Sequence, residues 1–324
     1  MPGAPDRLAG RPARTPVREG LVLAVLSAGS FGLSGAVVSG MFGSGWTAGA
    51  AVLVRIGIAA LVLVVPGLVA LRGRWSVLRR TAPTIVVYGV LAVAGAQLCY
   101  FYAVSYLDVG VALLIEYTAP VAVVVWMWAV HGQRPGRATV LGAALAAVGL
   151  VLLLDVLGGG SISLPGVLWA VGAMVGAATY FVVSADTSSG LPPITLAAGG
   201  LVVGGVLLGV LGVTGALPLA ASRDDVSYAP ATVPWWVPVA VLGLVTAAFA
   251  YVTGIAASRR LGPRLSSFVA LIEVVAAIAF ARLLLDQVPG PTQLLGAALV
   301  LAGVIVVRAG EPAHADSPVE DVGA

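Results

Sequence analysis

The sequence predicts an all-α polytopic membrane protein, with ten transmembrane helices arranged as two inverted five-helix repeats. The first observation is composition: the 324-residue chain is 60% hydrophobic and only 10% charged, too little charge to keep a soluble domain of this size in solution. The second is the length of the apolar runs, which reach the roughly 20 residues that a helix needs to cross a bilayer. The third is a repeat, because motifs of the first half recur in the second half at one fixed spacing.

Ten apolar runs follow one another along the chain. They lie at 20–42, 47–71, 82–104, 109–130 and 138–156 in the first half, and at 165–185, 194–214, 235–257, 265–285 and 291–308 in the second. We therefore expect a first repeat over residues 19–157 and a second over 158–309. The polar ends, 1–18 and 310–324, have no apolar face and are expected to be disordered cytoplasmic tails.

The basic residues predict the orientation. All 17 are arginines, and with the N-terminus in the cytoplasm all except Arg55, Arg223 and Arg282 fall in cytoplasmic segments. This distribution predicts a multi-pass protein of the inner or plasma membrane with both termini cytoplasmic. A scattered net charge of +3 gives no reason to expect nucleic acid as a partner, and a single cysteine with two isolated histidines gives none to expect a metal or a cofactor.

The repeat has a constant offset. Residues 141–145 (LGAAL), followed by Gly149, recur 154 positions later as 295–299, followed by Gly303. Each unit has five helices, an odd number, so the second copy enters the membrane in the opposite sense. Inverted repeats of this kind are typical of secondary transporters, which hold their substrate between the two halves.

The run 109–130 carries polar groups that lipid would penalise. Glu116 and Pro120 are four positions apart and share a helix face. The proline ring crowds the carbonyl of Glu116, so Pro120 is predicted to kink the helix. The acid and the displaced carbonyl should face protein or a watery cavity. This favours a binding site, although a simple proline kink with a solvated glutamate is the alternative.

These residues resemble the EamA-type drug/metabolite transporter family. The resemblance is carried by the proline-bearing fourth helix, by the turn 132–134 (GQR) with the helix that follows it, and by the repeat of that unit near the C-terminus. Residues 114–120 (LIEYTAP) are most similar to the threonine/homoserine exporter branch. The resemblance implies ten helices and proton-driven export of amino acids or similar metabolites. The chain departs from the family pattern at Gln133, at 286–287, and at Val274, which stands where the second repeat would match Pro120.

Two opposite charges fall at similar depth in the predicted bilayer. Arg55 in the second span and Glu116 in the fourth both lie roughly 9–12 Å below the outer boundary at 1.5 Å per residue. They are expected to hold the carboxylate and the ammonium of a zwitterion. A permanent Arg55–Glu116 bridge that only fastens helices is the alternative.

Glu273 lies near the middle of the ninth span and is the first candidate for proton coupling, with Glu116 the second. The alternative for Glu273 is a protonated carboxyl that is hydrogen-bonded between helices. Further polar and aromatic side chains at middle depth are expected to line the cavity, although each alone is compatible with packing. They are Phe31, Ser34, Gln97, Tyr100, Tyr102, Tyr117 and Tyr180.

The sequence thus predicts a transporter that exports a small polar metabolite, an amino acid or a derivative, by alternating access as a proton antiporter. Its expected partners are the solute, protons and the lipid bilayer, and a homodimer is left open. Efflux of drugs or lipophiles, and uptake of metabolites, are the alternatives within transport. An intramembrane enzyme is the least favoured alternative, since the spans contain no histidine, no lysine and no aspartate pair.

Overall fold

The computed structural model describes residues 15–118, 136–153, 163–185 and 189–310. The described elements of the first repeat are α1 (Thr15–Gly43), α2 (Ala48–Leu71), α3 (Trp75–Val87), η1 (Tyr88–Gly95), α4 (Ala96–Val104), α5 (Val109–Glu116) and α7 (Arg137–Leu153). Those of the second are α8 (Leu164–Ala185), α9 (Pro193–Val213), β1 (Val226–Ser227), β2 (Thr232–Val233), α10 (Trp236–Ala240), η3 (Val241–Phe249), α11 (Ala250–Val269), α12 (Ile272–Leu285) and α13 (Pro291–Gly310). The expected disorder of the two tails concerns residues that lie almost wholly outside the described part.

The prediction of an all-α membrane protein is confirmed. Within the described residues, five helical stretches are long and apolar enough to cross a membrane: Arg18–Gly43, Ala48–Leu71, Trp75–Val104, Pro193–Val213 and Trp236–Gly254. Three shorter apolar helices follow, namely Arg137–Leu153, Leu164–Tyr180 and Pro291–Val307. Together with α5 and α12 they occupy the ten predicted runs, but the number of ten spans stays a prediction.

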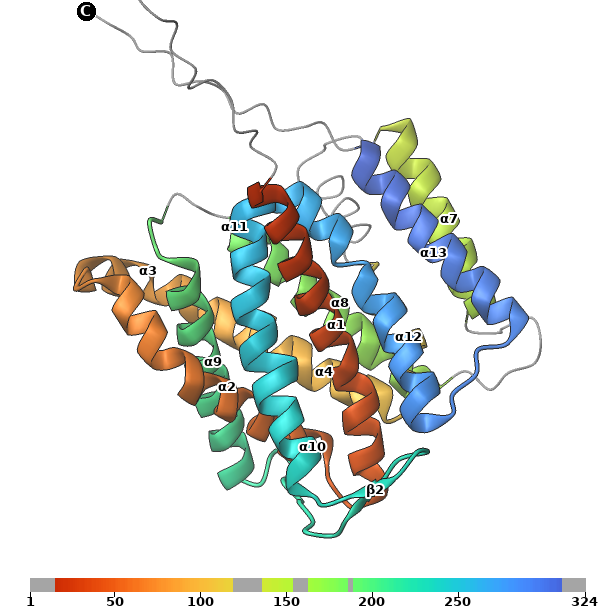
Figure 1. Ribbon diagram of the computed structural model, residues 1–324, viewed down its shortest axis with the longest axis horizontal. Coiled ribbons are helices and arrows are strands. Elements are labelled where there is room, and N and C mark those ends of the chain that lie inside the picture. Colours follow the sequence, from red (N-terminus) through yellow and green to blue (C-terminus); the bar gives the residue numbers. More distant parts are fainter. Residues whose placement is uncertain (1–14, 119–135, 154–162, 186–188, 311–324) are drawn as a thin grey trace, which may run out of the picture.

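The helices form a bundle with α1 beside α11 and α12, with α2 and α9 at one edge and α7 and α13 paired at the other (Figure 1). The start of α1 and the end of α13 lie at the same end of the bundle (Figure 1). The β1–β2 hairpin lies at the opposite end and pairs Val226 with Val233 in antiparallel register. A chain whose two ends lie on the same side of a membrane crosses that membrane an even number of times.

Local signals explain where the helices begin and end. The side chain of Thr47 accepts a hydrogen bond from the Ala50 amide and so caps the start of α2. The same helix ends at Arg72 and Gly73, which both have left-handed backbone conformations with φ of 50° and 77°. Between helices, small hydroxyls provide polar contacts, such as Thr195 to the Gly67 carbonyl at 2.8 Å.

The repeated glycine motifs pack directly against each other. A Cβ atom placed on Gly142 of α7 would lie 2.5 Å from the carbonyl oxygen of Gly303 in α13, and one on Gly149 would lie 2.7 Å from that of Gly296. The earlier glycine of one helix thus meets the later glycine of the other, so the two helices run antiparallel. Since Gly296 and Gly303 are the repeat equivalents of Gly142 and Gly149, equivalent residues cross at this contact.

Two π-helical segments also occupy equivalent positions. The segment η1 ends where α4 begins at Ala96, and η3 ends where α11 begins at Ala250, which is 154 positions further along. π-Helical turns are rare and occur often at functional sites, because their wider turn disturbs the backbone hydrogen-bond ladder. We did not predict these two π-helical segments, because the sequence carries no signal for them.

The fourth helix of the second repeat is broken, which corrects the continuous span expected at 265–285, because a turn at Ala270 and Leu271 separates α11 from α12. In the first repeat α5 ends at Glu116 and a turn follows at Tyr117 and Thr118, while the rest of the span expected at 109–130 lies outside the described residues. Leu271 is 154 positions after Tyr117, so the two turns occupy equivalent positions. Pro120 lies outside the described residues, and its kink stays a prediction.

The loop expected at 258–264 is also corrected, since α11 continues helically from Ala250 to Val269. Its sequence at 256–261 (AASRRL) favours helix. Arg260 donates a hydrogen bond to the Ala256 carbonyl and lies 3.7 Å from the carboxylate of Glu19, near the start of α1. Arg260 therefore lies at the end of the bundle where α1 begins. This is the end that the arginine distribution predicts to be cytoplasmic.

The hairpin segment forms a strap across the end of the bundle opposite the chain ends. The ring of Tyr228 packs on Gly40 of α1, and its hydroxyl donates a 2.8 Å hydrogen bond to the Val37 carbonyl. The next amide, of Ala229, donates to the Leu284 carbonyl of α12 at 2.8 Å. This strap joins α1 to α12 outside the apolar spans, and burial raises the pKa of the Tyr228 phenol above its ordinary value.

Candidate functional site

The two helix breaks meet inside the bundle. Tyr117, in the turn that ends α5, places its hydroxyl 2.7 Å from the Glu273 carboxylate and 3.1 Å from the Ala270 carbonyl. Ala270 lies in the break between α11 and α12, and Glu273 lies in the first turn of α12. A side chain of the first repeat is thus hydrogen-bonded to the broken helix of the second. Discontinuous helices at a repeat interface are typical of transporter binding sites.

Arg55 of α2 is buried at 3% exposure. Its guanidinium donates a 2.9 Å hydrogen bond to the Thr246 carbonyl of η3, and it lies 5.4 Å from the ring centroid of Phe101 and 6.0 Å from that of Phe31. Rings at these distances stabilise the cation through their negative faces. The Nε atom, however, has no hydrogen-bond partner among the described residues. One buried donor of the guanidinium therefore remains available to a ligand or a water.

Arg55, Glu116 and Glu273 share one electrostatic neighbourhood without touching. Arg55 interacts with both carboxylates, and the carboxylates interact with each other. Among the described residues, no salt bridge joins Arg55 to Glu116 or to Glu273. The permanent Arg55–Glu116 bridge that the sequence left open is absent from this arrangement, while the alternative of a hydrogen-bonded Glu273 matches its contact with Tyr117.

A second group of side chains is related by the repeat. Gln97 donates a long, 3.5 Å hydrogen bond to the hydroxyl of Tyr251, its equivalent 154 positions later. The rings of Tyr251 and Phe31 meet edge to face with centroids 5.3 Å apart. Tyr180, which lies in the helix equivalent to that of Phe31, packs its ring against that of Tyr88, with centroids 6.0 Å apart. The Oε1 atom of Gln97 is buried and has no hydrogen-bond partner among the described residues.

Small residues of α1 bring this region close to the helix breaks. A Cβ on Gly32 would meet the carbonyl oxygen of Glu273 at 2.7 Å, and one on Gly35 would meet the hydroxyl of Tyr100 at 2.3 Å. Ser34, between them in sequence, is buried. The α1 backbone therefore touches both the α4 and the α12 sides of the cluster, which only glycine permits at these two positions.

Most of the predicted side chains converge. Arg55, Phe31 and Tyr251 are in contact, Gln97 reaches Tyr251, and Tyr117 reaches Glu273. Tyr102 does not join them, since its ring stacks on Trp169 with centroids 4.6 Å apart. The sequence analysis missed three partners: Phe101, Tyr251 and the Thr246 carbonyl. The offset of 154 applied to Gln97 would have found Tyr251, whereas a backbone carbonyl carries no residue-type signal.

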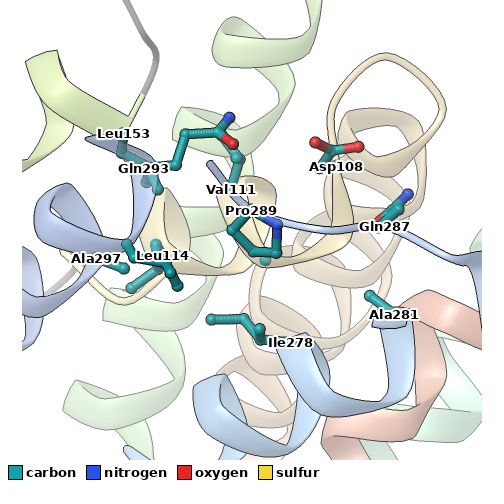
Figure 2. A pocket seen from close by; sticks show the side chains of 12 residues that line it. Asp108, Val111, Leu114, Leu153, Ile278, Ala281, Gln287, Pro289, Gln293 and Ala297 are labelled. Carbon is teal, nitrogen blue, oxygen red and sulfur yellow. The ribbon is translucent and has the colours of Figure 1, made fainter. Parts of the chain in front are cut away.

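One enclosed space in the described residues lies elsewhere, between the start of α5, the end of α12 and α13 (Figure 2). Its volume of about 30 Å³ suits one or two waters. Figure 2 shows the polar groups of Asp108, Gln287 and Gln293 near Pro289, with Ile278 on an apolar side. This space is too small for a metabolite, so we place the candidate site at the charged cluster.

Apolar helices long enough to cross a membrane, turns at equivalent positions of the two halves and a group of charges within the bundle are features of one class, that of helical membrane transport proteins. The model of one family, the EamA-like transporter family, matches residues 18–155 and again residues 164–309. The chain belongs to this family and is therefore a membrane transporter of small solutes.

The family assignment agrees with the fold. A protein known from a crystal structure superposes with a TM-score of 0.60 and 21% sequence identity, over 90% of this chain and 96% of the other. An identity of this size shows a common fold alone. No curated protein matches the sequence.

Proposed function

We propose that this transporter exports a small zwitterionic metabolite, an amino acid or a derivative, by alternating access in exchange for protons. The observation that carries the proposal is the group formed by the buried Arg55 and the half-buried Glu116 and Glu273, which share one neighbourhood without a salt bridge. Uncompensated charges in a membrane interior are costly and are retained where they serve a substrate or an ion.

The balance of charge supports proton exchange. With both carboxylates ionised, the guanidinium neutralises only one of them, and the group carries one net negative charge. One proton would restore neutrality. It would also remove a negative charge that attracts the ammonium of the substrate, so binding of one weakens binding of the other, which is the requirement for exchange.

The unsatisfied donor of Arg55 supports recognition of a carboxylate. Its Nε–H is buried and unpartnered among the described residues, and an unmade hydrogen bond of this kind is unfavourable until a ligand supplies the acceptor. A charge-assisted bond from guanidinium to carboxylate is among the stronger hydrogen bonds in proteins. Glu116, the last residue of α5, supplies the acceptor for an ammonium.

The test uses the protein in proteoliposomes with three matched compounds: an amino acid, its decarboxylated amine and its deaminated acid. A panel of amino acids first identifies the one exchanged most rapidly. The zwitterion is expected to bind at least about tenfold more tightly than either analogue, because each analogue lacks one hydrogen bond to a charged group of the site. Arg55→Ala should weaken binding of the zwitterion and leave binding of the amine nearly unchanged. Wild-type affinity for the zwitterion in Arg55→Ala would make the arginine structural.

Proton coupling is tested with Glu273→Gln. This variant should fold and should still exchange labelled for unlabelled substrate, but an imposed pH gradient should no longer drive accumulation. Gly209→Ala is the matched control, because a Cβ at Gly209 meets open space. Unchanged gradient-driven accumulation in Glu273→Gln would remove Glu273 from the mechanism.

A further inference from the structure

The Tyr117 hydroxyl lies between two acceptors but has one hydrogen to donate. The Glu273 carboxylate oxygen is 2.7 Å away and the Ala270 carbonyl oxygen is 3.1 Å away, and both distances are within hydrogen-bonding range. The hydroxyl therefore has two positions that the surrounding atoms already accommodate. Which of the two positions the hydroxyl adopts depends on whether Glu273 is protonated.

When Glu273 is ionised it can only accept, so Tyr117 donates to the carboxylate. When Glu273 is protonated, its own O–H can donate to the Tyr117 oxygen, and the tyrosine hydrogen is released for the Ala270 carbonyl. Each state leaves the half-buried hydroxyl with a partner, so the change requires only rotation of one O–H bond. No covalent bond is broken apart from the transfer of the proton to or from Glu273.

We propose that Tyr117 is the positioning residue of the proton step, whose hydroxyl moves between the Glu273 carboxylate and the Ala270 carbonyl as Glu273 gains and loses its proton. This inference rests on the proposed role of Glu273 in proton coupling. It also changes the expectation from the sequence, which placed Tyr117 among the substrate ligands.

The location of the two acceptors gives the switch a mechanical effect. Ala270 belongs to the turn between α11 and α12, and its carbonyl also accepts the Glu273 amide at 2.9 Å. Glu273 belongs to α12 itself. In the deprotonated state Tyr117 ties the end of α5 to a side chain of α12 alone, whereas protonation reverses the direction of that hydrogen bond and adds one to the backbone of the turn. Since α5 belongs to the first repeat and the turn to the second, protonation changes the contact between the halves.

The surroundings restrict the alternatives open to Glu273. The backbone of α1 packs at Gly32 against the Glu273 carbonyl, so the first turn of α12 cannot move closer to α1. The charged and titratable groups near Glu273 are Arg55 of α2, Tyr100 of α4, Glu116 of α5, Tyr117 in the turn after α5, and Tyr251 of α11. Of these, Tyr117 is the one hydrogen-bonded to the Glu273 carboxylate among the described residues.

The test compares Tyr117→Phe with Tyr102→Phe, a matched loss of a hydroxyl from a ring stacked on Trp169 outside the cluster. Tyr117→Phe should keep its affinity for the exchanged amino acid within about twofold, but the pH midpoint of transport should move by about one unit, as expected when a hydrogen bond to an ionisable group is lost. Tyr102→Phe should leave the midpoint unchanged. In a Glu273→Gln background, Tyr117→Phe should have no further effect on pH dependence.

An infrared measurement separates this inference from the transport function. The carboxyl C=O band that appears on acidification and is missing in Glu273→Gln belongs to Glu273, and its frequency should shift in Tyr117→Phe. A shifted band in a protein that exchanges no amino acid would overturn the proposed function and leave the switch standing. An unshifted band, or a large loss of substrate affinity with an unchanged pH profile, would overturn the switch and return Tyr117 to the substrate ligands.

Discussion

The guanidinium of Arg55 donates a 2.9 Å hydrogen bond to the carbonyl of Thr246, within the π-helical segment η3. The bond joins α2 of the first repeat to the irregular segment of the second, at a point where the wider turn alters the backbone ladder. Phe31 and Phe101 lie beside the same guanidinium. The arginine is therefore held in place by groups from three other elements before any ligand arrives.

This arrangement predicts a measurable coupling between Arg55 and Phe101. Phe101→Leu should destabilise the protein by about 1–3 kcal/mol, the sum of lost packing and a lost cation–π contact of about 0.5–2 kcal/mol. In an Arg55→Met background the same change should cost about 1 kcal/mol less, because no cation remains to stabilise. The measurement is unfolding of all four variants in mixed micelles. Additive effects would show that the ring only fills space.

Much of the fold could be predicted from the sequence because lipid imposes strong rules on composition. Continuous apolar runs could only be helices, and the offset of 154 identified α7 and α13 as repeat equivalents, although it did not predict that they cross through their glycines. The breaks at Tyr117 and Ala270 could not be predicted in the same way. Ala270 and Leu271 are apolar and neither is glycine or proline, so the local sequence carries no signal for a break, and its hydrogen bond from Tyr117 comes from the other repeat.

The candidate site was predictable where it consists of charges. Arg55, Glu116 and Glu273 are conspicuous in apolar runs because each is unfavourable there without a purpose. Phe101 and Tyr251 are ordinary residues for a membrane helix, and only their contacts in the fold, Phe101 with Arg55 and Tyr251 with Phe31 and Gln97, distinguish them from their neighbours. The role of Thr246 depends on its carbonyl, which every residue has.

The crossing of α7 and α13 predicts that Gly303 tolerates no side chain. A Cβ there would lie 2.5 Å from the Gly142 carbonyl oxygen and 2.6 Å from the Ala146 amide nitrogen, so the backbones must separate. Gly303→Ala should lower stability by about 1–3 kcal/mol, the usual range for overpacking. Thermal unfolding in detergent measures this. Gly57→Ala, in open space on α2, serves as the control and should be neutral or stabilising. Equal stability of the two variants would contradict the close crossing.

The Tyr228 strap predicts a stability change at high pH. Burial raises the pKa of this phenol, so the folded state favours the protonated form. The stability from this group is complete below about pH 10, the pKa of an unfolded tyrosine, and is lost as pH rises toward the folded pKa. Tyr228→Phe should be less stable than wild type by about 1 kcal/mol near neutral pH, because one hydrogen bond is missing.

The difference between wild type and Tyr228→Phe should then shrink above about pH 10. Melting temperatures in detergent across this range provide the measurement. Tyr106→Phe, an exposed position, is the control for general effects of losing a phenol. A difference that stays constant or grows with pH would mean that Tyr228 is not held in its neutral, hydrogen-bonded form.

The orientation predicted from the arginines can be tested with single cysteines. In a Cys99→Ala background, a cysteine at Ser76, near the start of α3, should lie in the cytoplasm, and one at Asp225, in the strap, should lie outside. Both positions are exposed. An impermeant thiol reagent applied to intact cells should modify the Asp225 variant and should modify the Ser76 variant only after the membrane is opened. The reverse pattern would invert the topology.

The crossing of Gly142 with Gly303 and of Gly149 with Gly296 has a consequence for how such a molecule can be assembled. Each half contributes the same surface, and that surface binds its own copy turned upside down. A five-helix half expressed alone would thus present both sides of the contact and could associate with a second half inserted in the opposite sense. The joined chain removes the need to insert one sequence in both directions, which leaves each half free to acquire its own charged residues, as Arg55 and Glu273 illustrate.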